Sequence, residues 1–368
     1  MFLLGDQGKT GEILTNTTAA MYQEAQRLAD SGTPLNSVAF VGDNFYPIGL
    51  NVDEGARIEL VEQVMGPMAR LLKQLGRTNV HAVPGNHDYY CDMFGPAPYG
   101  SCNAGNLYEL SIPLWTYHLN GPASIRYPVK RGSADSIELI MINSAFFVRY
   151  DREVWGYHLD SLRTLLKESS QNKSIKWRLM FAHHPIYTFG EHGGYRIWDP
   201  RVQRIRYLGN CVDDKKDPIK YIFEFANSHE DNCAPRYRYY RDSIMTIIHN
   251  GGARIHAYIA GHEHSLQFLA QRGGLANTPK IFIITGAASK HDAVRTSFID
   301  TRRGFQFFSH PQNTDERRGE SIPGFVSMQV ENNRLKFWFI NSNTKERTRM
   351  GGSEFFYVDN KGLLVETK

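Results

Sequence analysis

Short apolar runs recur along the chain, and most of them end at glycine or at polar residues. Four examples cover residues 38–41, 80–83, 178–181 and 256–259, each followed by a polar or glycine-containing turn. Runs this short, apolar on both faces, are typical of strands buried in a sheet. The pattern therefore predicts a sheet whose strands end in short polar loops.

Amphipathic segments between these runs predict helices. Between residues 57 and 75, apolar side chains recur every three or four positions, and Pro67 marks a point where the helix would kink. Residues 159–166 carry a similar leucine stripe. Strands that alternate with helices indicate a layered α/β fold, and ligands of such folds gather where the strands end.

The last third of the chain predicts hairpins. Two pairs of apolar runs flank turns that contain asparagine, namely residues 325–330 with 335–340 and residues 355–358 with 363–365. This β-rich half implies two stacked sheets within a single domain, residues 1–368. The sequence contains neither an internal repeat nor a low-complexity linker.

Composition and charge exclude some classes of function. The 368 residues are 41% hydrophobic and 22% charged, with a formal net charge of +4, which is ordinary for a globular protein. There is no dense basic stripe, so nucleic-acid binding is not predicted. No apolar run approaches the roughly 20 residues of a membrane helix. Because the first glycine-rich turn begins at residue 5, we expect further residues, such as a secretion signal, to precede Met1 in the native chain.

The four cysteines form two local pairs, Cys91 with Cys102 and Cys211 with Cys233. Neither pair has the C-x-x-C spacing of a zinc or redox motif. Two disulfides that close surface loops are one interpretation, and buried free thiols are the other. Glycosylation triplets begin at residues 16 and 172. Together these features favour an extracytoplasmic location, whether secreted, periplasmic or lysosome-like.

Polar side chains that suit metal ions follow one strand after another. Hard or borderline metals in hydrolases take carboxylate, amide and imidazole ligands. Any one such residue has an ordinary explanation, such as a turn-forming aspartate or a hydrogen-bonded histidine. Their repetition at equivalent places predicts a metal site formed by Asp6, Asp43, Asn86, His183, His262 and His264.

The blocks that carry these residues resemble the ordered motifs of the calcineurin-like metallophosphoesterases. They are GDQG at residues 5–8, GDN at 42–44, GNHD at 85–88, AHHP at 182–185 and GHEH at 261–264. The resemblance implies the fold of that family, a four-layer α/β/β/α sandwich of two mixed sheets flanked by helices. It also implies a hydrolase with two metal ions.

One position narrows the resemblance. Ordinary members carry a histidine two residues after the first aspartate, but that position is Gly8 here. Purple acid phosphatases lack this histidine and use a tyrosine three residues after the second aspartate, where this chain has Tyr46. The alternative is that Tyr46 is a packing aromatic in a turn. The blocks at 42–46 and 261–267 resemble the small, mammalian-like branch of purple acid phosphatases.

This resemblance implies two ligand sets that share one aspartate. The first metal would be Fe(III), held by a tyrosinate, and the second would be Fe(II), Zn or Mn. His183 rather than His184 matches the family's His-x-Pro block. The first set is Asp6, Asp43, Tyr46 and His264, and the second is Asp43, Asn86, His183 and His262.

The implied reaction is that of an acid phosphatase. A hydroxide held between the metals would hydrolyse a small phosphate monoester. His192 stands nine residues after His183, where similar phosphatases carry a histidine implicated as the acid for the leaving alkoxide. His87 is the other candidate for binding or protonating the phosphate. Either could instead be a surface imidazole, and Asp88 is expected to orient its neighbours.

Two other functions compete with this one. A phosphodiesterase or nucleotidase would use the same two-metal centre, because the pocket rather than the fold decides the substrate. A non-catalytic scaffold, like the membrane-anchoring relatives of this family, is disfavoured because all seven ligand positions are filled. Residues 193–240 form a segment that compact members lack, which is either a lid over the site or a disulfide-pinned decoration.

Overall fold

Two mixed β-sheets form the centre of the molecule. The computed structural model describes residues 1–50, 53–89, 104–150, 152–199, 204–210, 231–232, 234–292, 294, 305–310 and 322–367. All four cysteines lie outside these residues, so the two disulfides and the extracytoplasmic location stay predictions. So does the assignment of the whole chain to one domain. Within the described residues, no helix is long and apolar enough to cross a membrane.

The first sheet contains nine strands of the described chain, in the order β18-β17-β15-β14-β1-β2-β3-β4, with β16 paired to β15. Strands β1 to β4 run parallel, whereas β14 pairs antiparallel with β1. The strands are β1 (Phe2–Leu4), β2 (Val38–Phe40), β3 (Val80–Ala82), β4 (Thr116–Tyr117), β14 (Gly324–Glu331), β15 (Arg334–Asn341), β16 (Glu346–Thr348), β17 (Phe356–Val358) and β18 (Leu364–Thr367).

The second sheet has seven described strands, in the order β13-β11-β12-β10-β7-β6-β5. Strands β6, β7, β10 and β12 run parallel at its centre. A separate antiparallel pair, β8 (Gly194–Asp199) with β9 (Arg204–Asn210), lies in the predicted insert. The seven strands are β5 (Ala123–Pro128), β6 (Ser136–Met141), β7 (Ile175–Phe181), β10 (Ala257–Ala260), β11 (Leu266–Gln271), β12 (Ile281–Thr285) and β13 (Phe305–Ser309).

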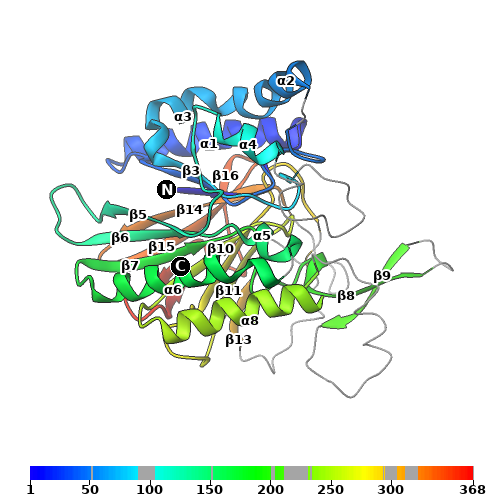
Figure 1. Cartoon of the computed structure of the whole chain (residues 1–368). Helices are drawn as coiled ribbons and strands as arrows, with labels where there is room; N and C mark the ends of the chain where they lie inside the picture. The colour runs from blue at the N-terminus through cyan, green and yellow to red at the C-terminus, as the bar shows by residue number, and fades with distance from the viewer. Residues whose placement is uncertain are drawn as a thin grey trace.

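Helices cover the outer face of each sheet, and this confirms the predicted four-layer sandwich (Figure 1). The helices on the first sheet are α1 (Glu12–Asp30), α2 (Glu54–Met65), α3 (Ala69–Leu75) and α4 (Ala104–Leu110). Those on the second sheet are α5 (Ser144–Arg149), α6 (Gly156–Gln171) and α8 (Pro235–Asn250). Short 3-10 turns span η1 (Gly66–Met68), η2 (Arg77–Asn79), η3 (Arg152–Val154) and η4 (Glu191–Gly193).

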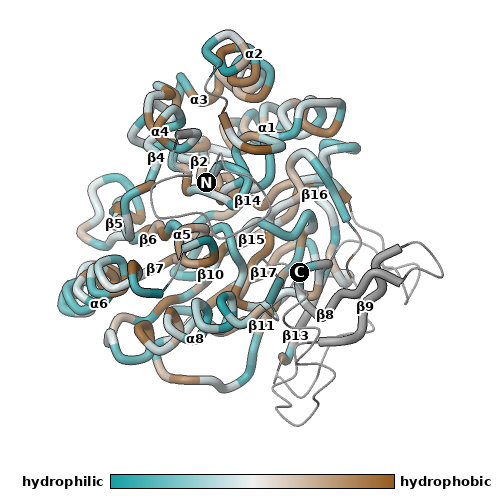
Figure 2. The backbone as a smooth tube through the Cα atoms, turned by 45° about the vertical axis from the view of Figure 1, so that its right-hand side comes forward, coloured by the Kyte–Doolittle hydropathy of each residue, from teal (hydrophilic) through white to brown (hydrophobic). Residues whose placement is uncertain are grey.

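Side chains alternate between the layers with the two-residue period of a strand. On β1, Leu3 packs between the two sheets, whereas Phe2 and Leu4 pack under α1 and its neighbours. On β10, Ile259 faces the space between the sheets and Tyr258 faces α8. In Figure 2, hydrophobic colour is frequent along the central strands and hydrophilic colour along the outer turns and loops. Burial on both faces explains why these strands read as continuous apolar runs.

Two local predictions can be compared with the structure. The helix expected over residues 57–75 is divided, because α2 ends at Met65 and a 3-10 turn that contains Pro67 separates it from α3. Proline has no N–H to continue the α-helical ladder, which accounts for the break. The hairpin of β14 and β15 turns at Asn332 and Asn333, which adopt φ angles of 48° and 57°. Asparagine tolerates this left-handed conformation better than most residues, and the predicted hairpin is confirmed.

Candidate metal centre

The carboxyl ends of strands from both sheets meet at one edge of the sandwich. Loops after β1, β2 and β3 leave the first sheet there, and loops after β7 and β10 leave the second. The backbone N–H of Gly5 donates to Thr285 across 2.9 Å, which ties the two sheets together at this edge. The predicted ligands therefore come together because parallel strands present their carboxyl ends on the same side.

Three of the predicted ligands have strained backbones. Asp6, Asp43 and His262 adopt φ angles of 59°, 55° and 68°, in the left-handed region that non-glycine residues seldom occupy. Each such residue costs on the order of 1–3 kcal/mol, and strain of this kind clusters at functional sites. The turns at these three strand ends are thus built to aim side chains rather than to maximise stability.

Three predicted ligands converge on the hydroxyl of Tyr46. Its hydroxyl lies within hydrogen-bond distance of two carboxylates, 2.9 Å from Asp6 Oδ1 and 2.7 Å from Asp43 Oδ2, and it is 3.3 Å from His264 Nε2. His264 Nε2 is itself 3.5 Å from Asp6 Oδ1. These four residues are the predicted ligands of the first metal, and the structure brings all of them together.

The other predicted set converges on the opposite side of Asp43. His183 Nε2 lies 2.8 Å from Asn86 Oδ1 and 3.3 Å from Asp43 Oδ1. His262 Nδ1 is 3.2 Å from the same Asn86 oxygen. One Asp43 oxygen thus faces Tyr46 and the other faces His183, which is the geometry that a bridging carboxylate requires.

The absence of a side chain at Gly8 has a steric reason. A Cβ at this position would lie 2.4 Å from the backbone nitrogen of Phe45 and 2.6 Å from its Cα. Gly8 also donates its N–H to Asp43 and accepts one from Tyr46, both at 3.1 Å. The first loop therefore packs directly on the loop that carries Tyr46 and leaves no room for a side chain at residue 8, while the tyrosine hydroxyl lies beside Asp6.

The electrostatics of the cluster suit bound cations. Burial and the charge of Asp43 raise the pKa of Asp6 well above its usual range. Burial also acts to raise the pKa of Asp43, but nearby His183 and His87 bring it well below its usual range. Among the described residues, Asp6, Asp43 and His183 place their ligand atoms within 4.8 Å of one another, as do His183, His184 and His262. Carboxylate, phenol, amide and imidazole groups match the donors of iron, zinc and manganese, so the residues fit a two-metal centre.

The two predicted catalytic histidines flank this cluster. His87 donates its backbone N–H to Asp43 Oδ1 at 2.9 Å, and its ring lies 4.4 Å from the ring of Tyr46 between centroids. The ring of His192 lies against that of His262, tilted by 34°, with centroids 4.3 Å apart. Both imidazoles are partly exposed, at 27% and 24% of the side chain. The structure thus places them where a substrate could reach them, and their catalytic roles stay predictions.

Asp88 holds the loops together, as expected. Its carboxylate accepts hydrogen bonds from the backbone N–H groups of Gly85, Asn44 and Phe45 at 2.7–3.1 Å. His184 is fully buried behind His262, with ring centroids 4.6 Å apart and Nδ1 3.0 Å from Ser144 Oγ. It belongs to neither ligand set implied by the sequence, although it lies close enough to His183 and His262 to share a cation with them.

Sequence analysis missed three charged residues at the site. Asp292 lies 2.6 Å from His264 Nδ1, and Asp231 lies 2.7 Å from His192 Nδ1. Carboxylates in such positions orient histidine rings. The ammonium of Lys290 lies 3.2 Å from the ring centroid of Tyr46. The motifs gave no signal for them, because all three come from loops outside the family blocks.

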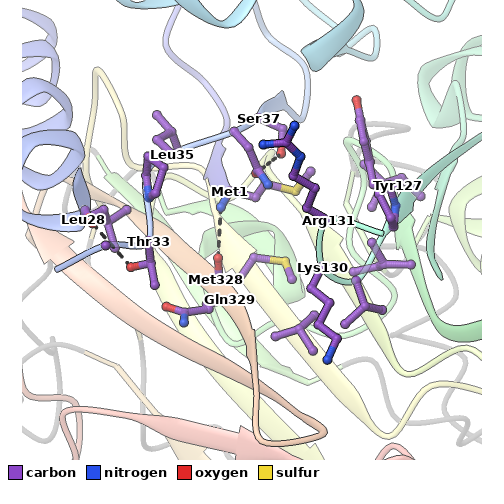
Figure 3. A pocket seen from close by; sticks show the side chains of 18 of the residues that line it. Met1, Leu28, Thr33, Leu35, Ser37, Tyr127, Lys130, Arg131, Met328 and Gln329 are labelled. Carbon is purple, nitrogen blue, oxygen red and sulfur yellow. Dashed lines mark hydrogen bonds between the residues drawn. The ribbon is translucent and has the colours of Figure 1, made fainter. Parts of the chain in front are cut away.

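A hollow of about 620 Å³ lies away from this edge, near the amino ends of the strands (Figure 3). It opens where β1 begins and where β5 and β14 end, and Leu35, Tyr127 and Met328 are among its lining residues. None of the predicted metal ligands lines it. The hollow is therefore separate from the candidate metal centre.

A layered sandwich with these donors at its strand ends defines a metallophosphoesterase. The model of the calcineurin-like phosphoesterase family matches residues 16–266, and the chain belongs to that family. It is 19% identical over 340 residues to tartrate-resistant acid phosphatase type 5 of Sus scrofa, covering 89% of this chain and 79% of the relative.

Two solved structures share the fold. One is described as GAP50, the anchor in the inner membrane complex of Plasmodium, with a TM-score of 0.60 and 13% identity over 100% of this chain and 89% of that one. The other is PhoD, with a TM-score of 0.54 and 11% identity over 100% of this chain and 71% of that one. At these identities the likeness concerns the fold alone.

Proposed function

We propose that this chain is a phosphatase that hydrolyses small phosphate monoesters with two metal ions bound at the sandwich edge. The observation that carries the proposal is the position of Asp43, whose two carboxylate oxygens face Tyr46 and His183 at 2.7 and 3.3 Å. The distant similarity to an acid phosphatase supports the monoester substrate. A phosphodiesterase or nucleotidase on the same scaffold is the alternative.

The two metals would occupy the two ligand sets. Asp6, Tyr46 and His264 would hold one ion, and Asn86, His183 and His262 the other, with Asp43 between them. A tyrosinate is a hard anionic donor, which favours Fe(III) at the first position and leaves Fe(II), Zn or Mn for the second. When bound, such a pair supplies charge neutralisation for the phosphoryl group and a nucleophile derived from water.

Residues of the chain would do the remaining work. Asp43 would join the two ligand sets. Its carboxylate also accepts a hydrogen bond from the backbone N–H of His87. His87 lies on the ring of Tyr46 and would contact the phosphoryl oxygens. His192 would give a proton to the leaving alkoxide, and its ring contact with His262 keeps it beside the second set. Phosphoryl transfer depends mainly on such positioning and charge neutralisation.

Hydrolysis of p-nitrophenyl phosphate by the iron-loaded protein tests this proposal against Asp43→Ala. We expect the variant to lose at least about a hundredfold in kcat, because one ligand of both metals is removed. Asp160→Asn is the matched control, since Asp160 is an exposed carboxylate paired with Arg163 on α6.

The same assay with bis(p-nitrophenyl) phosphate separates the alternatives. Faster turnover of the diester than of the monoester would favour the phosphodiesterase. No turnover of either ester by protein with two bound metals would overturn the proposal and favour a scaffold.

A further inference from the structure

Lys290 lies beside the metal centre. It belongs to neither ligand set, and it is not one of the two predicted catalytic residues. It follows the small-residue turn after β12, and its half-buried side chain places Nζ 3.2 Å from the centroid of the Tyr46 ring. The hydroxyl of the same ring contacts Asp6 and Asp43. The ammonium is thus held at the edge of the centre, next to the first ligand set.

A second lysine comes from the loop after β1, and Ser289 joins the two loops. Its hydroxyl accepts the backbone N–H of Lys9 at 3.1 Å and donates to the carbonyl oxygen of Asp6. Ser289 therefore places the loop of Lys9 next to the turn that carries Lys290.

Metal binding would change the net charge of the groups around the Lys290 ammonium. Without metals, the carboxylates of Asp6 and Asp43 attract it. Two divalent or trivalent ions would more than neutralise these carboxylates and the tyrosinate of Tyr46. A half-buried ammonium next to a positive centre is unfavourable unless an anion lies against it. Asp292 also attracts Lys290, but its carboxylate lies 2.6 Å from His264 Nδ1.

We propose that Lys290, with the more exposed Lys9 at the rim, binds a second anionic group of the substrate. This inference rests on the proposed phosphatase function and names its substrate class, which is small phosphate esters that carry a further carboxylate or phosphate. A lysine ammonium suits this task, because it is a compact charge with donors for carboxylate or phosphate oxygens. Esters without a second anion lack this contact and bind more weakly.

Binding of two phosphonates to the metal-loaded protein tests the proposal without requiring turnover. 3-Phosphonopropionate carries a carboxylate at its far end, and n-butylphosphonate has a similar length and no second charge. Calorimetry should show that the first binds at least about tenfold more tightly at low salt. In Lys290→Met, this preference should fall about tenfold, while the affinity for n-butylphosphonate changes less than about twofold and two metals remain bound.

Lys336→Met is the matched control, because Lys336 also lies over an aromatic ring, 4.2 Å from the centroid of Phe355, but on the distant strand β15. It should leave the preference unchanged. An unchanged preference in Lys290→Met would overturn the proposal, and so would an equal loss of affinity for both phosphonates, which would place Lys290 on the first phosphoryl group. Protein that binds both phosphonates as expected but hydrolyses no ester would refute the proposed function and leave the anion subsite standing.

Discussion

The Nδ1 atom of His192 lies 2.7 Å from a carboxylate oxygen of Asp231. This contact joins the predicted general acid to a residue of the predicted insert, residues 193–240. The backbone N–H of His192 also donates to the carboxylate of Glu263 at 2.8 Å. In the sequence, Glu263 stands between the predicted metal ligands His262 and His264. The described part of the segment therefore reaches the site, since Asn232 also donates its backbone N–H to the carbonyl oxygen of His192 at 2.9 Å and the ring of Tyr237 lies 6.4 Å from that of His262 between centroids.

We expect Asp231→Asn to slow hydrolysis of esters with poor leaving groups. A carboxylate against Nδ1 stabilises the doubly protonated imidazolium and fixes the ring, and an amide does so less well. For an alkyl phosphate, kcat should fall about ten- to a hundredfold. For p-nitrophenyl phosphate, whose leaving group needs no proton, it should fall less than about threefold. His192→Ala should give the same pattern.

The ratio of the two rates separates a role in proton transfer from a role in folding. Equal losses for both esters would mean that Asp231 only supports the loop. Asp242→Asn is a suitable control, because Asp242 is an exposed carboxylate on α8 that pairs with its neighbour Arg241.

Gly8→Ala tests whether the first two loops must touch. The new Cβ would meet backbone atoms of Phe45, which cannot rotate away. We expect a loss of about 1–3 kcal/mol in the free energy of unfolding, measured with urea, together with weaker metal binding. Gly156→Ala is the matched control, since a Cβ there meets nothing within 4 Å and the residue begins helix α6. It should be neutral or stabilising by about 0.5 kcal/mol, and similar losses in both variants would contradict the packing argument.

The parts of the site that could be predicted are those that repeat with the strands. The sequence predicts Asp6, Asp43 and His183 because each follows a buried apolar run, and the end of the run marks the end of a strand. Parallel strands then bring those ends together. Asp231 and Asp292 could not be found in this way. They lie 39 and 28 residues from the histidines they contact, and their positions depend on loops rather than on a period. The division of the helix at Pro67 was anticipated as a kink, because proline acts through local geometry alone.

Two histidines that are not metal ligands, buried His81 and partly buried His118, predict a loss of stability in acid. His81 on β3 lies 3.2 Å from His118, and Tyr127 contacts its other ring nitrogen at 2.6 Å. Burial lowers the pKa of His81 to about 4. Burial and the charge of His81 lower the pKa of His118 to about 3. Both therefore stay neutral in the folded protein at a pH where the unfolded chain takes up protons, near its ordinary pKa of about 6.5.

The sign of the effect follows from this difference in bound protons. As the pH falls from about 6.5 to 4, the unfolded state binds more protons than the folded state, so the free energy of unfolding decreases. Each histidine contributes at most about 1.4 kcal/mol per pH unit, and partly exposed His118 contributes less. Urea unfolding of His81→Gln between pH 6.5 and 4.5 should therefore show a shallower slope than the parent, by roughly 1 kcal/mol per pH unit. His249→Gln on α8 serves as the control, and parallel curves for His81→Gln and the parent would show that His81 is protonated in the folded protein.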